Sequence, residues 1–134
     1  MTRPLVPTVW IVDDDLGFVC WLGDILTEAG CRALPALSCR EAVVRMMRLG
    51  IEPDLIVLNP HLPGVARMLQ RRVRAKRHPK IVTIGTPPEA LAASIRVHAT
   101  LERPFGSQPM SRPEWLERVR KLLREPQARE LEDR

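Results

Sequence analysis

The chain has 134 residues and a mass of 15.2 kDa, enough for one domain with its own hydrophobic core. Its composition of 45% hydrophobic and 28% charged residues, with a net charge of +5, is ordinary for a globular protein in water. No apolar run approaches the roughly 20 residues of a membrane span, and the N-terminus lacks the apolar stretch of a secretory signal. We therefore expect a cytoplasmic protein without a membrane partner.

Short apolar runs alternate with helical stripes along the chain, a pattern typical of a parallel sheet covered by helices. Five such alternations predict an α/β fold, in which a doubly wound five-stranded parallel sheet carries helices on both faces in three αβα layers. The expected strands are Thr8–Val12, Arg32–Leu34, Asp54–Leu58, Lys80–Ile84 and Ala99–Leu101.

Helices are expected after the first two strands. The first starts after Asp15 and ends at Gly30, which suits a left-handed C-terminal cap. The second opens with a capping box from Ser38 to Glu41 and ends at Gly50. The residues expected to face inward are Phe18, Val19, Leu22, Ile25, Leu26 and Ala29 in the first helix, and Val43, Met46 and Met47 in the second.

Two later helices carry the same start signal with a proline in the first turn, from Thr86 to Glu89 and from Ser111 to Glu114. The last helix is expected to end before Pro126, so that residues 8–124 form one domain and residues 125–134 a polar tail or the start of a linker. Its inward side chains are expected to be Trp115 or Leu116, with Val119, Leu122 and Leu123.

Basic residues concentrate between Leu55 and Pro88, a stretch that contains no acid. A solvated helix face is our first interpretation, and a surface for a negatively charged partner is the second. The seven basic residues are Arg67, Arg71, Arg72, Arg74, Lys76, Arg77 and Lys80.

The cysteines and histidines show no metal-ligand spacing. Three cysteines are an odd number without a Cys-x-x-Cys pair, which indicates buried or incidental thiols rather than a disulfide or a zinc site. The histidines are scattered, and we assign none of them a catalytic role. These residues are Cys20, Cys31 and Cys39, and His61, His78 and His98.

Polar side chains follow three of the expected strands. Three consecutive acids at positions 13–15 follow the first strand, Asn59 follows the third, and Arg103 precedes Pro104 and Phe105 after the fifth. In this order, from about Thr8 to Leu123, these features resemble the receiver domain of bacterial two-component response regulators. The resemblance implies the CheY-like, flavodoxin-like form of the fold predicted above.

The resemblance also implies a reaction that this chain departs from. In the family an acid pair, here Asp13 and Asp14, holds Mg²⁺ while an aspartate attacks a phosphohistidine and a lysine neutralises the phosphoryl oxygens. The phosphoacceptor position is Asn59, whose amide oxygen is not an anionic nucleophile. Arg103 replaces the lysine and keeps its charge in a planar, less mobile group.

Some binding capacity remains in this expected pocket. Asp14, the amide oxygen of Asn59 and the backbone carbonyl of His61 would ligate Mg²⁺ only weakly, because one negative charge is lost. We further expect Arg103 to hydrogen-bond Asn59 and so hold the pocket in one state. By resemblance, the bond between Arg103 and Pro104 is expected to be cis.

Two further family positions differ. The hydroxyl that bonds the phosphoryl oxygens falls on Ile84, with Thr83 and Thr86 as shifted candidates, and the aromatic switch residue falls on Thr100. The resemblance therefore predicts a degenerate receiver, or pseudo-receiver, without the phosphorylation switch. Because the segment between Asn59 and Arg103 is shorter than usual in the family, the third and fourth helices should be trimmed or displaced, which puts the family's standard dimer modes in doubt.

We predict that the chain is not an enzyme but a phosphorylation-independent receiver of bacterial phosphorelay signalling, acting through contact with a kinase, an output domain or a regulator. A homodimer is left open, as is an output domain beyond residue 134. The expected partner surface includes Trp21, Arg71, Arg72 and Arg74.

Three alternatives were weighed. A receiver could still respond to phosphate through Asp13, Asp14 or a serine. A Mg²⁺-dependent phosphohydrolase could use the acids at positions 13–15, but no glycine-rich loop follows a strand. A nucleic-acid-binding module could use the Arg67–Lys80 basic segment, although 4% aromatic residues disfavour a stacking platform, and we do not expect nucleic acid as a partner of this domain alone.

Overall fold

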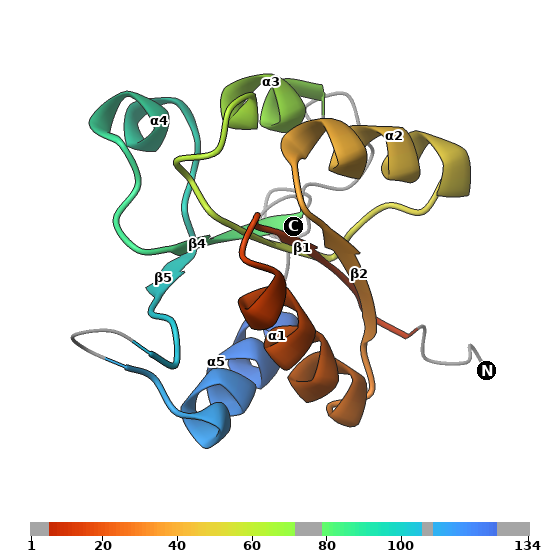
Figure 1. The fold of residues 1–134 in the computed structure, drawn as a ribbon, viewed down its shortest axis with the longest axis vertical. Helices are drawn as coiled ribbons and strands as arrows, with labels where there is room; N and C mark the ends of the chain where they lie inside the picture. The colour runs from red at the N-terminus through yellow and green to blue at the C-terminus, as the bar shows by residue number, and fades with distance from the viewer. Residues whose placement is uncertain (1–5, 72–78, 106–108, 126–134) are drawn as a thin grey trace, which may run out of the picture.

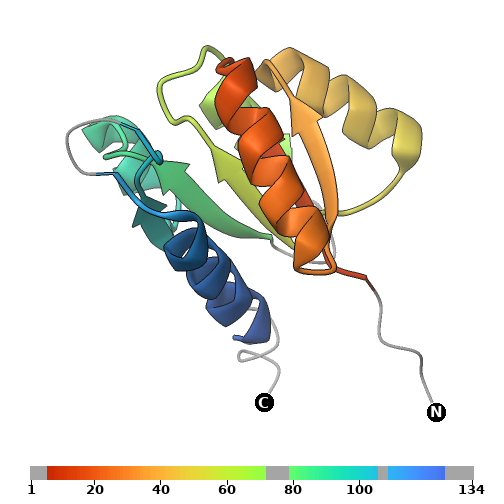
Figure 2. The same cartoon turned by 60° about the horizontal axis from the view of Figure 1, so that its bottom comes forward.

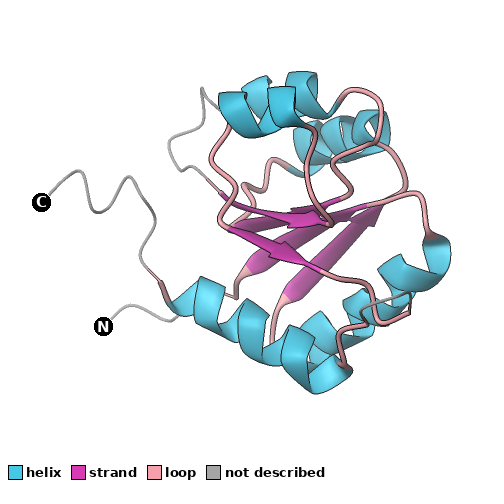
Figure 3. Cartoon of the chain, turned by 90° about the vertical axis from the view of Figure 1, so that its left-hand side faces the viewer, coloured by secondary structure: helices cyan, strands magenta, loops and turns pink. Residues whose placement is uncertain are grey.

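The computed structural model describes residues 6–71, 79–105 and 109–125. These residues form three layers, with a five-stranded sheet between two layers of helices (Figures 1 and 3). The three-layer αβα architecture expected from the alternating pattern is thereby confirmed.

All strand pairs in the sheet are parallel, and the strand order is β2-β1-β3-β4-β5. The chain moves outward in one direction from β1 to β2 and in the other direction from β3 to β5. In such sheets functional groups gather where the direction changes, here between the carboxyl ends of β1 and β3. The strands are β1 Thr8–Val12, β2 Arg32–Ala36, β3 Leu55–Leu58, β4 Lys80–Ile84 and β5 Ala99–Leu101.

The helices divide between the two faces of the sheet. Helices α1 and α5 cover one face and lie side by side in Figure 2, whereas α2, α3 and α4 cover the other (Figure 1). None of the helices in the described ranges is long and apolar enough to cross a membrane. The helices are α1 Leu16–Glu28, α2 Cys39–Leu49, α3 Val65–Gln70, α4 Glu89–Ser94 and α5 Arg112–Arg124.

The central strands are buried on both faces, which explains their continuous apolar sequences. Along β1, Val9 and Ile11 join the core under α1 and α5, while Trp10 and Val12 join the core under α2, α3 and α4. A strand in an all-parallel sheet covered on both sides has no polar face to present, so hydrophobicity does not alternate along it.

The helix starts follow the sequence signals in part. Asp15 accepts the backbone N–H of Phe18 at the start of α1, and Ser111 forms the full expected capping box at α5. At α2, Ser38 accepts the N–H of Glu41, but the Glu41 carboxylate accepts from the backbone of Leu37 instead of closing the box. The expected second half of that box is therefore wrong.

The expected cap at Thr86 is also wrong. Helix α4 begins after Pro88, which has no side chain that could cap it. Within the described ranges, α3 and α4 have six residues each.

Strand β2 runs two residues beyond its expected end and includes Pro35. The backbone groups of Arg32 and Ala36 bond towards β1, so those of Pro35 point away from the sheet. The missing N–H of Pro35 therefore removes no bond from the sheet, as is usual for proline in an edge strand. Its carbonyl accepts a hydrogen bond from Arg45. Strand β3, by contrast, starts at Leu55 rather than Asp54, whose carboxylate accepts the N–H of Thr8.

The inward faces of α2 and α5 differ in part from the expected ones. Helix α2 buries Cys39, Ala42 and Met46, while Met47 is 70% exposed. The choice between the first two inward candidates of α5 is resolved in favour of Trp115, which is fully buried. The three cysteines are free thiols, and burial raises the pKa of the two buried ones, Cys31 and Cys39.

Lys80 does not belong to an exposed basic face. It is almost completely buried, and its ammonium donates to the backbone carbonyls of Leu122 and Glu125 at the C-terminal end of α5. A cation at that end of a helix satisfies carbonyls that lack helical partners. An unbroken helical surface from Arg67 to Lys80 is therefore wrong, since α3 ends at Gln70 and Lys80 begins β4; residues 72–78 lie outside the described ranges.

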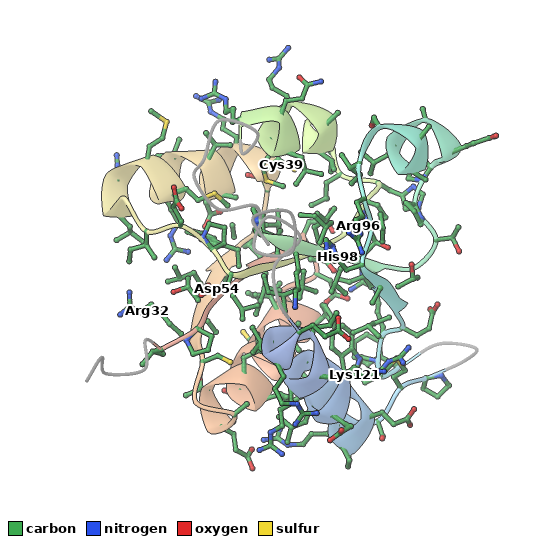
Figure 4. All side chains as sticks on the ribbon, turned by 180° about the vertical axis from the view of Figure 1, so that it is seen from behind. Arg32, Cys39, Asp54, Arg96, His98 and Lys121 are labelled. Atoms are coloured by element: carbon green, nitrogen blue, oxygen red, sulfur yellow. The ribbon has the colours of Figure 1, made fainter. Side chains whose placement is uncertain are left out.

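His98 joins β5 to β4 through both its backbone and its ring. Its N–H donates to the carbonyl of Ile81 at 2.8 Å, and its ring Nδ1 accepts the N–H of Ile81 at 3.1 Å. Burial, with the neighbouring charges of Arg96 and Lys80, lowers the pKa of His98, while Glu125 acts in the opposite direction. Figure 4 shows Arg96 and His98 next to each other. A protonated ring cannot accept the Ile81 N–H, so this hydrogen bond requires the neutral form.

We predict that this bond makes stability depend on pH. Because the pKa of His98 is lower in the folded chain than its ordinary value of 6.5, the contribution is complete above pH 6.5 and is lost as the pH falls below it. The variant His98→Asn keeps an acceptor in its amide oxygen but does not titrate in this range. Between pH 7.5 and pH 5, its free energy of unfolding, measured with urea, should fall by about 1 kcal/mol less than that of the wild type. Equal losses in both proteins would contradict the assignment.

Candidate functional site

Three sequence-predicted residues meet at the carboxyl edge of the sheet. Asp13 follows β1 and its N–H bonds the carbonyl of Ala36 at 3.1 Å, while Asn59 follows β3 and its N–H bonds the carbonyl of Val12 at 2.9 Å. Arg103 follows β5. The backbone hydrogen bonds thus place Asp13 and Asn59 next to each other, between β1 and β3, where the order of the strands changes direction.

The shortest polar contact of the site joins Arg103 to Asp13. The Arg103 Nη1 lies 2.7 Å from Oδ2 of Asp13, whose side chain is 0% exposed, whereas that of Arg103 is 25% exposed. This approach lacks the alignment of a hydrogen bond, so the guanidinium stabilises the buried oxygen mainly through its charge. A buried carboxylate without a compensating cation would cost several kcal/mol.

Arg103 has two further neighbours, both on or next to α1. Its Nη1 lies 3.4 Å from Oδ2 of Asp15, the residue that caps the helix, and its guanidinium lies 4.9 Å from the ring centre of Phe18. A planar guanidinium can stack on an aromatic ring while its edge contacts carboxylates, which a lysine cannot do in the same way. Arg103 is therefore held from three sides.

Asn59 is fixed by two hydrogen bonds that define its amide orientation. Its Oδ1 accepts the N–H of His61 at 3.0 Å, and its Nδ2 donates to Oδ1 of Asp13 at 3.4 Å. The expected bond between Asn59 and Arg103 is wrong, because both side chains turn to Asp13 instead. An aspartate at this position would bring a second negative charge against Asp13 where the amide brings a donor.

The donor set does not fit Mg²⁺ in this arrangement. The carboxylate of Asp13 is already paired with the guanidinium of Arg103, and the amide oxygen of Asn59 accepts the N–H of His61. Asp14 is exposed. Within the described ranges, no group of three or more His, Cys, Asp or Glu side chains forms a metal-binding cluster. A hard divalent cation needs several oxygens that converge, and here a guanidinium stands among them.

The residues that the resemblance implies at the hydroxyl and switch positions make local contacts. Ile84 is buried in the core under α1 and α5. The hydroxyl of Thr83 donates to the carbonyl of Gly85 at 3.0 Å and lies 3.2 Å from the hydroxyl of Thr100, its register partner on β5. Thr83 therefore donates to Gly85 and accepts from Thr100, and position 100, where the resemblance implies an aromatic ring, carries a small side chain.

The loops around the site are joined by His61. Its ring Nε2 lies 3.2 Å from the carbonyl of Thr86, which links the loop after β3 to the loop after β4. The peptide bond between Arg103 and Pro104 is trans, so the cis bond implied by the resemblance is wrong.

Arg103 rests on an aromatic cluster that was not predicted from the sequence. The ring of Phe18 lies within 6.1 Å of Trp21 and 5.6 Å of Trp115, centre to centre. The indole N–H of Trp115 donates to the carbonyl of Glu102, next to Arg103, at 2.7 Å. The signal was the placement of Phe18 three residues after Asp15, on the same side of the helix.

The expected partner-surface residues do not form one patch in the described ranges. Trp21 is half-buried against the other aromatic rings, on the α1 side of the sheet. Arg71 is exposed next to α3 on the opposite side. Arg72 and Arg74 lie outside the described residues.

Comparison with known proteins identifies the fold. No protein-family model and no curated protein matches the sequence. The structure is similar to a signal receiver domain from Vibrio parahaemolyticus, with a TM-score of 0.69 and 18% identity over 96% of each chain. It is also similar to a CheY-like response regulator receiver domain from Methanospirillum hungatei, with a TM-score of 0.70 and 17% identity over 89% of this chain and 94% of the other.

A response regulator receiver protein from Burkholderia phymatum gives a TM-score of 0.66 and 22% identity, over 91% of this chain and 98% of the other. Structural neighbours with these identities establish the fold, which is the CheY-like receiver fold. The expected resemblance is thereby confirmed at the level of architecture.

We predict that Arg103 stabilises the fold through Asp13. Arg103→Ala leaves a buried carboxylate without its cation and should lower the free energy of unfolding by about 3 kcal/mol. Arg103→Lys keeps the charge but loses the planar stack on Phe18, and should cost about 1 kcal/mol. Urea unfolding provides the measurement, with Arg124→Ala as control, since Arg124 only pairs with Glu117 on the exposed face of α5. Equal effects of Arg103→Ala and Arg124→Ala would refute this role.

Proposed function

We propose that the chain is a degenerate receiver domain of two-component signalling that works without phosphorylation, through contacts with other proteins. The observation that carries the proposal is the closed set of contacts around Asp13, which Arg103 and Asn59 approach from two sides. A kinase, an output domain or another regulator is the expected class of partner, and we propose no catalytic activity for the chain itself.

Chemistry at the phosphoacceptor position supports this proposal. Forming an acyl phosphate needs a carboxylate oxygen that attacks phosphorus with its own negative charge. The Asn59 amide is neutral, its oxygen accepts the N–H of His61, and its nitrogen donates to Asp13. Neither atom is available as a nucleophile.

The charges around the position support it as well. A receiver that accepts a phosphoryl group has to bring Mg²⁺ to its acid pair, which requires the acids to be accessible. Here Asp13 is fully buried and compensated by Arg103, and Asp15 contacts the same guanidinium. The cation that the site needs for stability is thus a permanent part of the chain.

The hydroxyl and the aromatic ring that transmit the signal in the family also have no counterparts at the positions implied by the resemblance. The hydroxyl position is the apolar Ile84, and the switch position is Thr100, which is paired with Thr83. A phosphoryl group would therefore meet no hydroxyl at Ile84, and no aromatic ring could change its position in response. These features favour a domain that stays in one state.

The alternatives have less support. Asp13 is buried and paired, so a receiver that uses another acceptor would depend on the exposed Asp14 or on a serine. Nucleic-acid binding loses one of its proposed contacts, because Lys80 is buried against α5.

We predict no acyl phosphate on treatment with acetyl phosphate and Mg²⁺. Intact-mass spectrometry should show no base-labile phosphoryl adduct, because the carboxylate that would carry it is an amide. A receiver domain with an aspartate at the corresponding position, treated in parallel, verifies that the donor is active. An adduct that maps to Asp14 or a serine would support the alternative acceptor and overturn the proposal.

We also predict that two substitutions together open the site to Mg²⁺. The double variant Asn59→Asp/Arg103→Lys restores a third carboxylate and replaces the stacked guanidinium by a mobile ammonium, so Mg²⁺ affinity should rise at least about tenfold. Calorimetric titration measures it, and Arg103→Lys alone is the matched control. The proposal fails if the wild type binds Mg²⁺ as tightly as the double variant.

A further inference from the structure

We propose that the groove between α2 and α3 binds an acidic amphipathic helix of a partner protein. The groove is formed by Val43, Met46, Met47 and Met68, with Arg67 and Arg71 at its rim. This inference deepens the proposed function, on which it rests for the premise that the domain acts by contact, and it names the surface and the chemistry of that contact.

The groove is a hollow of about 510 Å³ that continues into a second one of about 450 Å³. The second shares Met47, Met68 and both rim arginines, and extends to Arg40 and Pro63. Figure 4 shows α2 and α3 next to each other, with Cys39 between them. Cys39 lines the second hollow and lies at the N-terminal end of α2. The combined length follows the two helices and suits an elongated ligand better than a compact one.

The floor of the groove is apolar and adaptable. Met47 is 70% exposed and Val44 39% exposed, although both side chains are hydrophobic. Met46 and Met68 are buried beneath them and belong to the core on this face. Methionine side chains are flexible and polarisable, so a surface rich in them can fit closely against the side chains of a helix.

The charged residues that line the groove are all basic. Arg40, Arg67 and Arg71 line it, and no acid is among its lining residues. Across the described ranges these three arginines make no ion pair; Arg71 contacts only the sulfur of Met47, at 4.0 Å. Glu41, the acid at the start of α2, lies instead near Arg45.

The apolar floor and the arginines at the rim together indicate which kind of ligand fits the groove. An apolar floor needs apolar side chains at helical spacing, and a rim of arginines needs carboxylates beside them. A second copy of the chain would place the same arginines against each other across a symmetric contact, which is repulsive. Nucleic acid would satisfy the arginines but leave the methionine floor without a partner. An acidic amphipathic helix satisfies both.

The chain offers its own reporters for a test. Three of its five methionines, Met46, Met47 and Met68, line the groove, while Met110 packs against the core on the opposite face. The full-length protein is labelled with ¹³C at the methionine methyl groups and titrated with a synthetic helical peptide, with leucines at i, i+3, i+4 and i+7 and glutamates elsewhere. We expect the signals of the three groove methionines to shift, and that of Met110 to stay unchanged.

Matched variants test the role of the rim. Arg67→Glu/Arg71→Glu should weaken binding of the glutamate peptide about tenfold or more, since charges at a binding surface are reversed. Arg120→Glu/Arg124→Glu reverses two arginines at the same spacing on α5 and should leave the affinity unchanged. A version of the peptide with lysines in place of the glutamates should not bind the wild type.

Four outcomes would overturn the proposal: no shift of the groove methionines with the glutamate peptide, equal binding of the lysine peptide, shifts that grow with protein concentration alone, or shifts with duplex DNA. Leu131→Ser removes an apolar side chain from the polar tail at residues 125–134. A change in the groove signals in this variant would also overturn the proposal, because the chain's own tail would then be the occupant. None of these results bears on the acetyl phosphate and Mg²⁺ experiments, so failure of the groove and failure of the phosphorylation-independent site are distinguishable.

Discussion

The carboxylate of Asp13 is fully buried at the edge of the sheet, and a buried negative charge must be compensated if the fold is to be stable. Arg103 supplies the compensating charge from the far strand, and Asn59 supplies a donor from the neighbouring one. Because Arg103 is in turn stacked on Phe18, this single charge connects the loops after β1, β3 and β5 to the first helix.

The same compensation is consistent with the proposed function. With an arginine in permanent contact with Asp13, a metal ion would be in competition with the chain itself. Under the proposed function, the amide at position 59 accepts no phosphoryl group that would need such an ion. A hydroxyl at position 84 or an aromatic ring at position 100 would then have nothing to respond to, and these positions carry side chains that pack or pair locally.

The layers and most strand bounds could be predicted, because apolar runs and capping residues report local structure directly; the order of the strands in the sheet was not among the predictions. The contacts of Arg103 could not be predicted. The sequence pattern places Asp13, Asn59 and Arg103 at one edge of the sheet, but it does not determine which side chains pair. The exposure of Met47 was missed because helical periodicity assigns a face, whereas the six-residue α3 is too short to cover it. The second strand was predicted to end at Leu34 and so to exclude Pro35, because the sequence pattern does not show that this strand lies at the edge of the sheet.

That edge position has a consequence for self-association. An outer strand with unpaired amide groups is a template on which another chain can add a strand, and unchecked addition leads to fibrils. In β2, Pro35 has no amide hydrogen to offer on the outer side, and Arg45 already holds its carbonyl. Sheet extension from one molecule to the next is thereby disfavoured at this end of β2.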